Sequence, residues 1–231
     1  MSDTGSVMPF FLSEVDNNAD FCHRILFISI YGSSCNLFLF LCYTVSMKKV
    51  IVDIDNTLWD FASVLWERMR KINPGVPAPE EWTLFDFWRQ YCSPREFYTI
   101  IKGIHCEQDR FNPYSDAKEF LASLSRLGFY IIIASHREKG TLEPTIKWLE
   151  KNDLIFHEVH LSHDKTVLFN DCWAVVDDSP FILDKALELQ VLGAGLRVPW
   201  NKNGKYMLFD SLAEIYNFLN DKERAISTLT S

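Results

Sequence analysis

The sequence predicts an α/β protein with a Rossmann-like, doubly wound parallel sheet and a small helical cap inserted after the first strand. Short apolar runs rich in β-branched residues, at 50–54, 129–134 and 173–176, alternate with segments of helical periodicity. Such alternation is typical of a parallel sheet that helices cover on both faces. The stretch 58–114 breaks the alternation, and it is much longer than the roughly a dozen residues that one crossover helix needs.

Each predicted element follows from a local pattern. The run 50–54 is expected to be a strand buried on both faces, because continuous rather than alternating apolar residues mark such strands. A helical pattern at 117–127 and the turn residue Gly128 lead into the second run, and helical spacing returns at 144–152 and 182–189. In sheets of this kind, reactive groups collect at the carboxyl ends of the strands.

The insert at 58–114 is expected to fold into several short helices. Apolar residues recur in it at helical spacing, and a proline-rich turn lies at 73–79. Its place in the chain puts it over the end of the first strand, where it would act as a cap. Its aromatic side chains could stack a base, although such residues more often form the core of a small insert: they are Trp59, Phe61, Trp82, Phe85 and Trp88.

The predicted catalytic core comprises residues 47–57 and 115–220, with the cap at 58–114 between them and a C-terminal tail at 221–231. Residues 1–46 form an N-terminal extension outside this core. The catalytic interpretation depends only on the core and the cap.

Three interpretations fit the N-terminal extension. Residues 25–45 are apolar and aromatic and long enough to cross a bilayer as a helix, and Lys48 and Lys49 after them would place the following domain on the cytoplasmic side. The extension could otherwise be a divergent segment, or the working chain could begin at Met47, before a first strand typical of a short cytosolic enzyme. A cleaved signal peptide fits poorly because the leading segment is acidic. We therefore expect a cytoplasmic protein, with a membrane-anchored form as the alternative.

Composition argues against several classes of function. The formal net charge is −8 and no run of Lys or Arg accumulates, whereas a general nucleic-acid binder needs a basic surface. The six cysteines include no CxxC pair, so neither a zinc site nor a disulfide framework is indicated. The segment with His157, His160 and His163 is not the HExxH of a zinc protease. A small phosphorylated substrate, bound through a metal ion and local cations, suits an acidic chain.

Polar side chains follow the candidate strands. Because the carboxyl ends of parallel strands meet at one edge of the sheet, these groups are expected to converge. Each has a structural explanation alone, as a helix cap or a solvated side chain, but their joint order favours a site. In chain order they are Asp53 and Asp55; Ser135, His136 and Arg137; Lys165; and Asp177 and Asp178.

Asp53 and Asp55 predict a bound cation. Side chains two residues apart on a strand point to the same side, and two such carboxylates repel each other unless a cation lies between them. Mg²⁺ prefers hard oxygen ligands in an octahedron. Asp53 could offer one oxygen to the metal and the other to phosphorus, whereas Asp55 could offer its backbone carbonyl. One of Asp177 and Asp178 would supply a further ligand.

The same groups predict phosphoryl transfer, which needs charge neutralisation more than covalent help. Mg²⁺, Lys165 and Ser135 could surround the equatorial phosphoryl oxygens. A carboxylate nucleophile splits hydrolysis into two easier steps through an acyl phosphate, and we assign that role to Asp53. Asp55 would protonate the leaving group and then take a proton from the attacking water.

The order of DxDxT, strand then Ser, Lys, and strand then Asp-Asp resembles the haloacid-dehalogenase (HAD) superfamily of phosphohydrolases over nearly all of residues 48–220. The segments 161–167, 175–180 and 197–201 further resemble the 5′(3′)-deoxyribonucleotidase group, which carries a helical cap, uses magnesium and dephosphorylates nucleoside monophosphates. The resemblance implies magnesium held by Asp53, Asp55 and Asp178, support from Asp177, and phosphate contacts from Ser135 and Lys165.

Further residues are predicted to contact the substrate. Arg137 could reach its phosphate or ribose, and His136 lies beside it in the chain. Trp59, four residues after Asp55, is the cap aromatic best placed for a contact. Two motifs depart from the nucleotidase group, because Asn-Thr-Leu-Trp follows Asp55 where Gly-Val-Leu is usual, and Ser-His-Arg at 135–137 replaces Thr-Ser-Pro.

The sequence therefore predicts a magnesium-dependent phosphomonoester hydrolase that works through a phosphoaspartate, with nucleoside monophosphates as candidate substrates. A sugar phosphate or a phosphorylated protein side chain is the alternative substrate. A non-catalytic regulatory or interaction protein of the same fold is a third hypothesis. Such a protein would be expected to have lost Asp53, Asp55 or Lys165, and all three are present.

Overall fold

The structure, a computed structural model, describes residues 22–32, 35–45 and 47–229. The chain divides into two compact units, Met1–Met47 and Lys48–Ser231. In the first unit, strands β1 (Cys22–Gly32) and β2 (Cys35–Val45) pair antiparallel.

Residues 25–32 and 35–45, the described part of the segment considered above as a membrane-spanning helix, thus belong to strands. Its many Ile, Phe and Tyr residues favour the extended backbone. In the described part of the chain, no helix combines the length and the apolar character needed to cross a bilayer.

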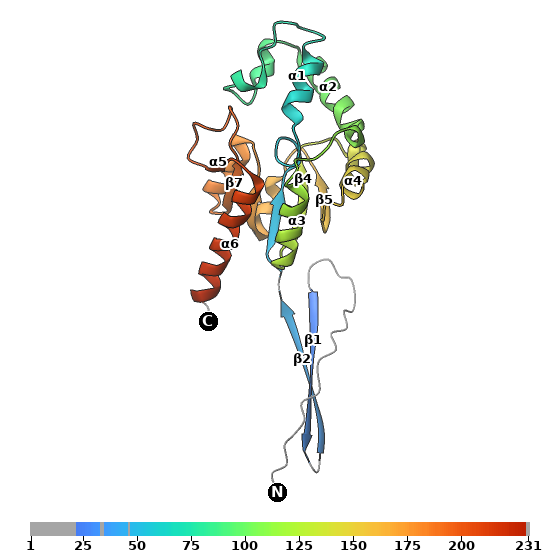
Figure 1. Cartoon of the computed structure of the whole chain (residues 1–231), viewed down its shortest axis with the longest axis vertical. Helices are drawn as coiled ribbons and strands as arrows, with labels where there is room; N and C mark the ends of the chain where they lie inside the picture. The colour runs from blue at the N-terminus through green and yellow to red at the C-terminus, as the bar shows by residue number, and fades with distance from the viewer. Residues whose placement is uncertain (1–21, 33–34, 46, 230–231) are drawn as a thin grey trace. The chain divides into compact units, whose positions relative to one another are not determined.

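The second unit is built around a six-stranded parallel sheet with strand order β5-β4-β3-β6-β7-β8 (Figure 1). The predicted runs form its three central strands, which confirms the fold class. The strands are β3 (Lys49–Val52), β4 (Tyr130–Ser135), β5 (Glu158–Leu161), β6 (Cys172–Val176), β7 (Leu192–Leu196) and β8 (Met207–Phe209).

Alternate side chains of β3 enter two separate cores, because successive residues of a strand point to opposite faces. Val50 and Val52 pack with residues of α3 (Ala117–Arg126) and α6 (Leu212–Leu229). Ile51 packs in a second cluster with residues of β4, β6 and α5 (Pro180–Glu188). The sheet is therefore covered on both faces, as its continuous apolar strands predict.

The last helix extends past the predicted end of the catalytic core. The residues from 221 onward, predicted as a tail, continue α6 as far as Leu229. The segment contains neither Gly nor Pro, so nothing in it interrupts the helix.

The residues between β3 and α3 form helices, and Figure 1 shows α1 and α2 beyond one end of the sheet. Helix α1 (Phe61–Met69) begins at Asp60, whose side chain accepts the Ser63 N–H. Helix α2 (Pro94–Cys106) begins with a reciprocal capping box of Ser93 and Glu96. The connections contain the short 3-10 turns Pro79–Glu81, Phe87–Gln90 and Gln108–Arg110.

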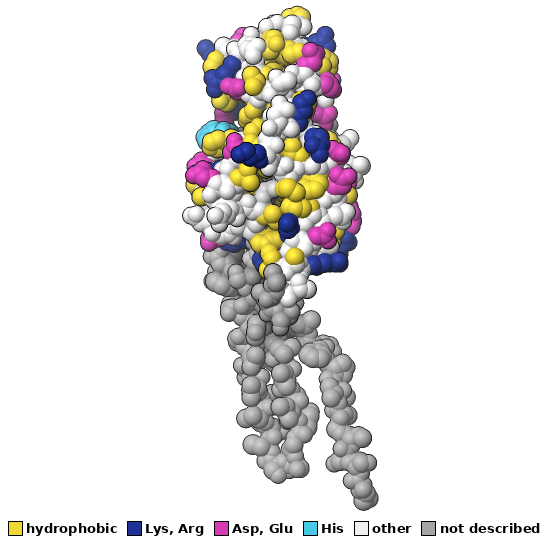
Figure 2. Space-filling model, turned by 90° about the vertical axis from the view of Figure 1, so that its left-hand side faces the viewer, with side chains coloured by type: hydrophobic (Ala, Val, Ile, Leu, Met, Phe, Trp, Pro, Cys, Tyr) yellow, Lys and Arg dark blue, Asp and Glu magenta, His cyan; other side chains and the backbone are white. Residues whose placement is uncertain are grey.

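The rest of the second unit consists of connections that carry site residues. Helix α4 (Leu142–Lys151) links β4 to β5, and 3-10 turns lie at Lys139–Thr141 and Thr166–Asp171. On the face of this unit shown in Figure 2, basic and acidic side chains are interspersed.

Candidate active site

Asp53 follows the last residue of β3, at the carboxyl edge of the sheet. Its backbone N–H donates to Val176 O of β6 at 2.9 Å, so the ends of the two central strands are tied together. The chain then turns sharply at Asn56, whose φ of 59° lies in the left-handed region that Asn tolerates. The Asn56 side chain accepts the Ala62 N–H at 2.8 Å, which links this turn to the start of α1.

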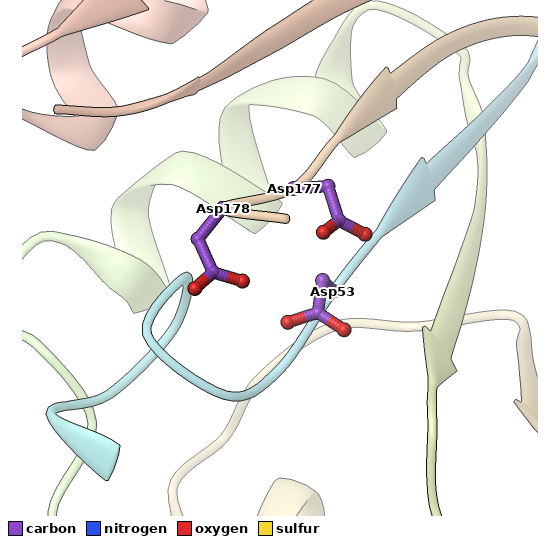
Figure 3. A group of neighbouring side chains, drawn as sticks. All are labelled: Asp53, Asp177 and Asp178. Atoms are coloured by element: carbon purple, nitrogen blue, oxygen red, sulfur yellow. The ribbon is translucent and has the colours of Figure 1, made fainter. Parts of the chain in front are cut away.

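Asp53, Asp177 and Asp178 form a buried carboxylate cluster. Figure 3 shows Asp53 from β3 facing Asp177 and Asp178 from the end of β6. One oxygen from each of the three lies within 4.8 Å of the others. Burial, together with the negative charges of Asp177 and Asp55, raises the pKa of Asp53 to about 7 against the opposing charge of Lys165. Burial and the charges of Asp53 and Asp177 also raise the pKa of Asp178 well above its usual range.

Lys165 neutralises part of this charge. Its Nζ lies 2.5 Å from Asp53 Oδ1 and 2.5 Å from Asp177 Oδ2. Burial alone would lower the pKa of Lys165, but the two carboxylates raise it above its ordinary value. Among the residues that the structure describes, Lys165 is the one cationic side chain paired with the cluster, so three carboxylates share one positive charge. Such a cluster of hard oxygen ligands fits Mg²⁺.

The two neighbouring acids are held differently. Asp177 is engaged at both oxygens, since Oδ1 accepts the Ser179 N–H at 2.9 Å and Oδ2 faces Lys165. Asp178 accepts hydrogen bonds from Asn56 Nδ2 at 3.2 Å and Trp200 Nε1 at 3.0 Å, both at Oδ2. This leaves Oδ1 of Asp178 as the oxygen best able to bind a cation.

The carboxylate of Asp55 lies outside the cluster, and the predicted metal contact of Asp55 is through its backbone carbonyl. Its Oδ1 accepts from Trp59 Nε1 at 2.9 Å and Arg137 Nη2 at 2.5 Å. Its Oδ2 accepts from Arg137 Nε at 3.1 Å and Ser135 Oγ at 3.3 Å, and it lies 3.1 Å from His105 Nε2. Burial would raise the pKa of Asp55, but the charges of Arg137 and His105 hold it well below its usual range.

Arg137 and Trp59 both bond to the Asp55 carboxylate. The Arg137 guanidinium is fully buried, bidentate to Asp55, and donates from Nη1 to Thr145 Oγ1 at 3.0 Å. Trp59 is 1% exposed and stacks on Phe111 with ring centroids 4.9 Å apart. Both were predicted to contact the substrate. The burial of Trp59 leaves it no such contact in this structure, whereas Arg137 lines the cavity of the site and its substrate contact stays a prediction. In this structure both side chains hold Asp55.

A cavity of about 570 Å³ extends from the carboxylates into the cap. Its walls include aromatic side chains from the cap and from the core. Among them, Phe85, Tyr98 and Phe181 are 53%, 54% and 68% exposed. The predicted site residues that line it are Asp53, Asp55, Ser135, His136, Arg137, Lys165, Asp177 and Asp178.

No protein-family model and no curated protein matches the sequence. Among solved structures, a HAD family hydrolase from Deinococcus radiodurans R1, with bound phosphate and sodium, is 15% identical and superposes with a TM-score of 0.53 over 76% of this chain and 96% of that one. A predicted phosphoglycolate phosphatase from Haemophilus somnus is 16% identical, with a TM-score of 0.53 over 75% and 98%. The chain has the fold of the HAD hydrolases.

A third structure, a HAD-superfamily hydrolase from Ehrlichia chaffeensis, is 17% identical with a TM-score of 0.50 over 76% of this chain and 98% of that one. At identities this low, the superpositions establish the fold alone. The activity therefore has to be argued from the residues of the site.

Three residues around Asp55 and Asp178 lie outside the predicted set. Asn56 sits within the Asp motif itself, and its positive φ is a turn property that Asn signals. Trp200 lies in the Arg-Val-Pro-Trp-Asn segment already noted for its resemblance. His105 comes from the end of α2, with no motif around it, so only the docking of the cap brings it to Asp55.

His136 and His163 meet at the wall of the cavity. His163 Nδ1 lies 3.2 Å from His136 Nε2, and both rings line the cavity. Burial and the charges of His163 and Lys165 lower the pKa of His136. This placement agrees with a substrate-facing position for His136.

Proposed function

We propose that the protein is a magnesium-dependent phosphomonoester hydrolase that works through a phosphoaspartate at Asp53. The observation that carries this proposal is the convergence of Asp53, Asp177 and Asp178 around a common space with Lys165 as their paired cation. We assign Asp178 as the side-chain ligand beside Asp53, because its Oδ1 is the less engaged oxygen. Asp55 would contribute its backbone carbonyl.

The residues of the chain divide the chemistry between two steps. Mg²⁺, when bound, would neutralise charge on the phosphoryl oxygens. Asp53 attacks phosphorus and forms an aspartyl phosphate while the bond from phosphorus to the leaving oxygen breaks. Asp55, which has to enter this step with a proton taken from solvent, gives that proton to the leaving oxygen. Asp55 then takes a proton from water, which attacks phosphorus, releases inorganic phosphate and restores Asp53. Ser135 and Lys165 hold the phosphoryl oxygens through both steps.

For the substrate we propose a nucleoside monophosphate rather than polymeric nucleic acid. The exposed rings of Phe85, Tyr98 and Phe181 on the cavity wall support a flat, apolar leaving group, since stacking on an aromatic side chain contributes about 1–3 kcal/mol per base in nucleic-acid binders. The interspersed surface charges (Figure 2) offer no extended basic area on the face shown.

We place the enzyme in the cytoplasm. Cys92, Cys106 and Cys172 are free thiols in the described part of the chain, and free thiols suit a reducing compartment.

The test compares wild type with Asp53→Asn on p-nitrophenyl phosphate and Mg²⁺, followed by a panel of nucleotides, sugar phosphates and phosphopeptides. We expect the variant to lose all turnover, because the amide cannot attack phosphorus, and the nucleoside monophosphates to give the highest kcat/KM. Asp221→Asn, on the exposed side of α6, is the matched control. Undiminished turnover by Asp53→Asn would refute the assignment of the nucleophile.

A further inference from the structure

A side chain of helix α2 reaches the reacting groups. His105 lies in the last turn of α2 and is 3% exposed, with Nε2 at 3.1 Å from Asp55 Oδ2. In the tautomer that carries the hydrogen on Nε2, His105 donates to Asp55 Oδ2, the same oxygen that accepts from Arg137 Nε. The Phe61 ring of α1, whose centroid lies 5.5 Å from that of His105, packs beside the imidazole. The cap itself therefore holds this donor in place.

The other donors to Asp55 belong to the core or to the turn after β3. Arg137 and Ser135 come from the end of β4, and Trp59 follows the turn. Ser135 is the residue expected to turn toward a phosphoryl oxygen when substrate binds. Once Ser135 leaves Asp55 Oδ2, the donors left on that oxygen are Arg137 Nε and His105 Nε2.

The position of His105 depends on how α2 docks against the core. One turn earlier in the same helix, Lys102 pairs with Glu138 of the core at 2.7 Å. That pair is about half exposed on both sides, so it adds little to stability. Two contacts thus join α2 to the core: the buried one from His105 to Asp55 and the exposed one from Lys102 to Glu138. Only the first touches a group that transfers a proton.

We propose that His105 is a positioning residue, through which the docked cap holds the Asp55 carboxylate in the orientation that serves the leaving group. The proposal rests on the proposed function, since it gives Asp55 the acid/base role. With α2 docked, His105 and Arg137 fix Asp55 from the cap and from the core. With α2 undocked, Oδ2 loses the donor from α2, and the carboxylate is held by Arg137 and Trp59 alone. Proton transfer is thereby coupled to closure of the cap over the substrate.

The test compares His105→Ala and His105→Gln on two substrates that differ in their need for a proton. The p-nitrophenolate of p-nitrophenyl phosphate departs without protonation, whereas the alkoxide of a nucleoside monophosphate does not. We measure kcat/KM, because it reports formation of the phosphoenzyme and not its breakdown. For the nucleotide we expect His105→Ala to lose about 10- to 100-fold, the scale of a misplaced reacting group. For p-nitrophenyl phosphate we expect a much smaller loss.

His105→Gln should recover most of the nucleotide activity, because its amide N–H can reach the same oxygen. Lys102→Ala is the matched control on the same helix, and it should change kcat/KM for both substrates by the same factor. An equal loss of kcat/KM for both substrates in His105→Ala, without recovery in His105→Gln, would overturn the positioning role. Failure of the proposed function is distinct, since the wild type would then hydrolyse neither substrate or Asp53→Asn would remain active.

Discussion

The ammonium group of Lys165 lies 2.5 Å from Oδ1 of Asp53, with both side chains buried. This contact holds the carboxylate of the proposed nucleophile from one side and leaves its second oxygen for a cation or for phosphorus. It also places the positive charge where the equatorial phosphoryl oxygens would lie. The same lysine thus neutralises part of the charge of the metal-free cluster and lies where it can stabilise the transition state.

Lys165→Met should destabilise the metal-free protein and abolish useful activity. Removing one partner of a buried ion pair typically costs about 3–5 kcal/mol, and losing one charge-stabilising donor costs about 100-fold or more in kcat. Because the variant cluster is more negative, Mg²⁺ should raise its melting temperature more than it raises that of the wild type. Lys185→Met, which breaks the surface pair with Glu188, is the control. Equal metal-free stability of Lys165→Met and wild type would contradict the charge argument.

Arg137→Lys should behave almost like Arg137→Met. The guanidinium contacts both oxygens of Asp55, and an ammonium group cannot reproduce that paired geometry. We expect either change to lower kcat about 100-fold or more and to lower the urea midpoint. Thr145→Val removes the acceptor of Nη1 and the donor to Thr141 O, so it should cost about 1–3 kcal/mol in unfolding free energy. Full activity in Arg137→Lys would show that the paired contact is dispensable.

His157 should lower the free energy of unfolding in mild acid. Its Nδ1 accepts the Ile131 N–H at 2.9 Å and so extends the pairing of β5 with β4. Burial lowers the pKa of His157 in the folded protein, so the unfolded chain takes up the proton first. The stabilisation is complete above the unfolded pKa of about 6.5 and is lost as the pH falls below it.

His157→Asn tests this pH dependence, because its Oδ1 keeps the acceptor and cannot be protonated. Urea midpoints measured at pH values of about 5.5 and 7.5 span the predicted window. The acid-side loss of stability should be smaller in the variant than in the wild type. An identical loss in both proteins would assign the pH dependence to other groups.

Phe85→Ala should weaken binding of substrates with a flat leaving group. Phe85 is exposed on the cavity wall, so its removal should cost little folding energy. We expect KM for a nucleoside monophosphate to rise about 5- to 100-fold, the equivalent of one stacking contact, with little change for a small sugar phosphate. Leu84→Ala, equally exposed in the preceding position, is the control. A matching rise in KM for the sugar phosphate would argue against stacking.

The sequence predicts the central strands and the residues at their tips, because a buried parallel strand needs a continuous apolar run whatever surrounds it. It does not predict β7, whose Leu-Gly-Ala-Gly-Leu contains two weak strand formers. The structure explains one of these residues. A Cβ on Gly195 would collide with the backbone oxygen of Asp177, so the edge of the site itself requires glycine.

The functions of individual side chains were harder to predict than their location. Arg137 and Trp59 do lie beside the acids, but the sequence cannot show that both are buried and bonded to Asp55. His105 carries no local signal, since its approach to Asp55 depends on the packing of α2 against the core. Motifs thus locate the reacting groups, while tertiary packing determines which neighbours position them.

Chemical trapping of the phosphoenzyme tests the central claim most directly. The protein is mixed with substrate and Mg²⁺, quenched in acid and reduced with borohydride, which converts an aspartyl phosphate into homoserine, and peptides are then sequenced by mass spectrometry. We expect homoserine at position 53, only when Mg²⁺ and substrate are both present. Turnover of substrate with Asp53 unmodified, or with the label on another residue, would contradict the proposed chemistry.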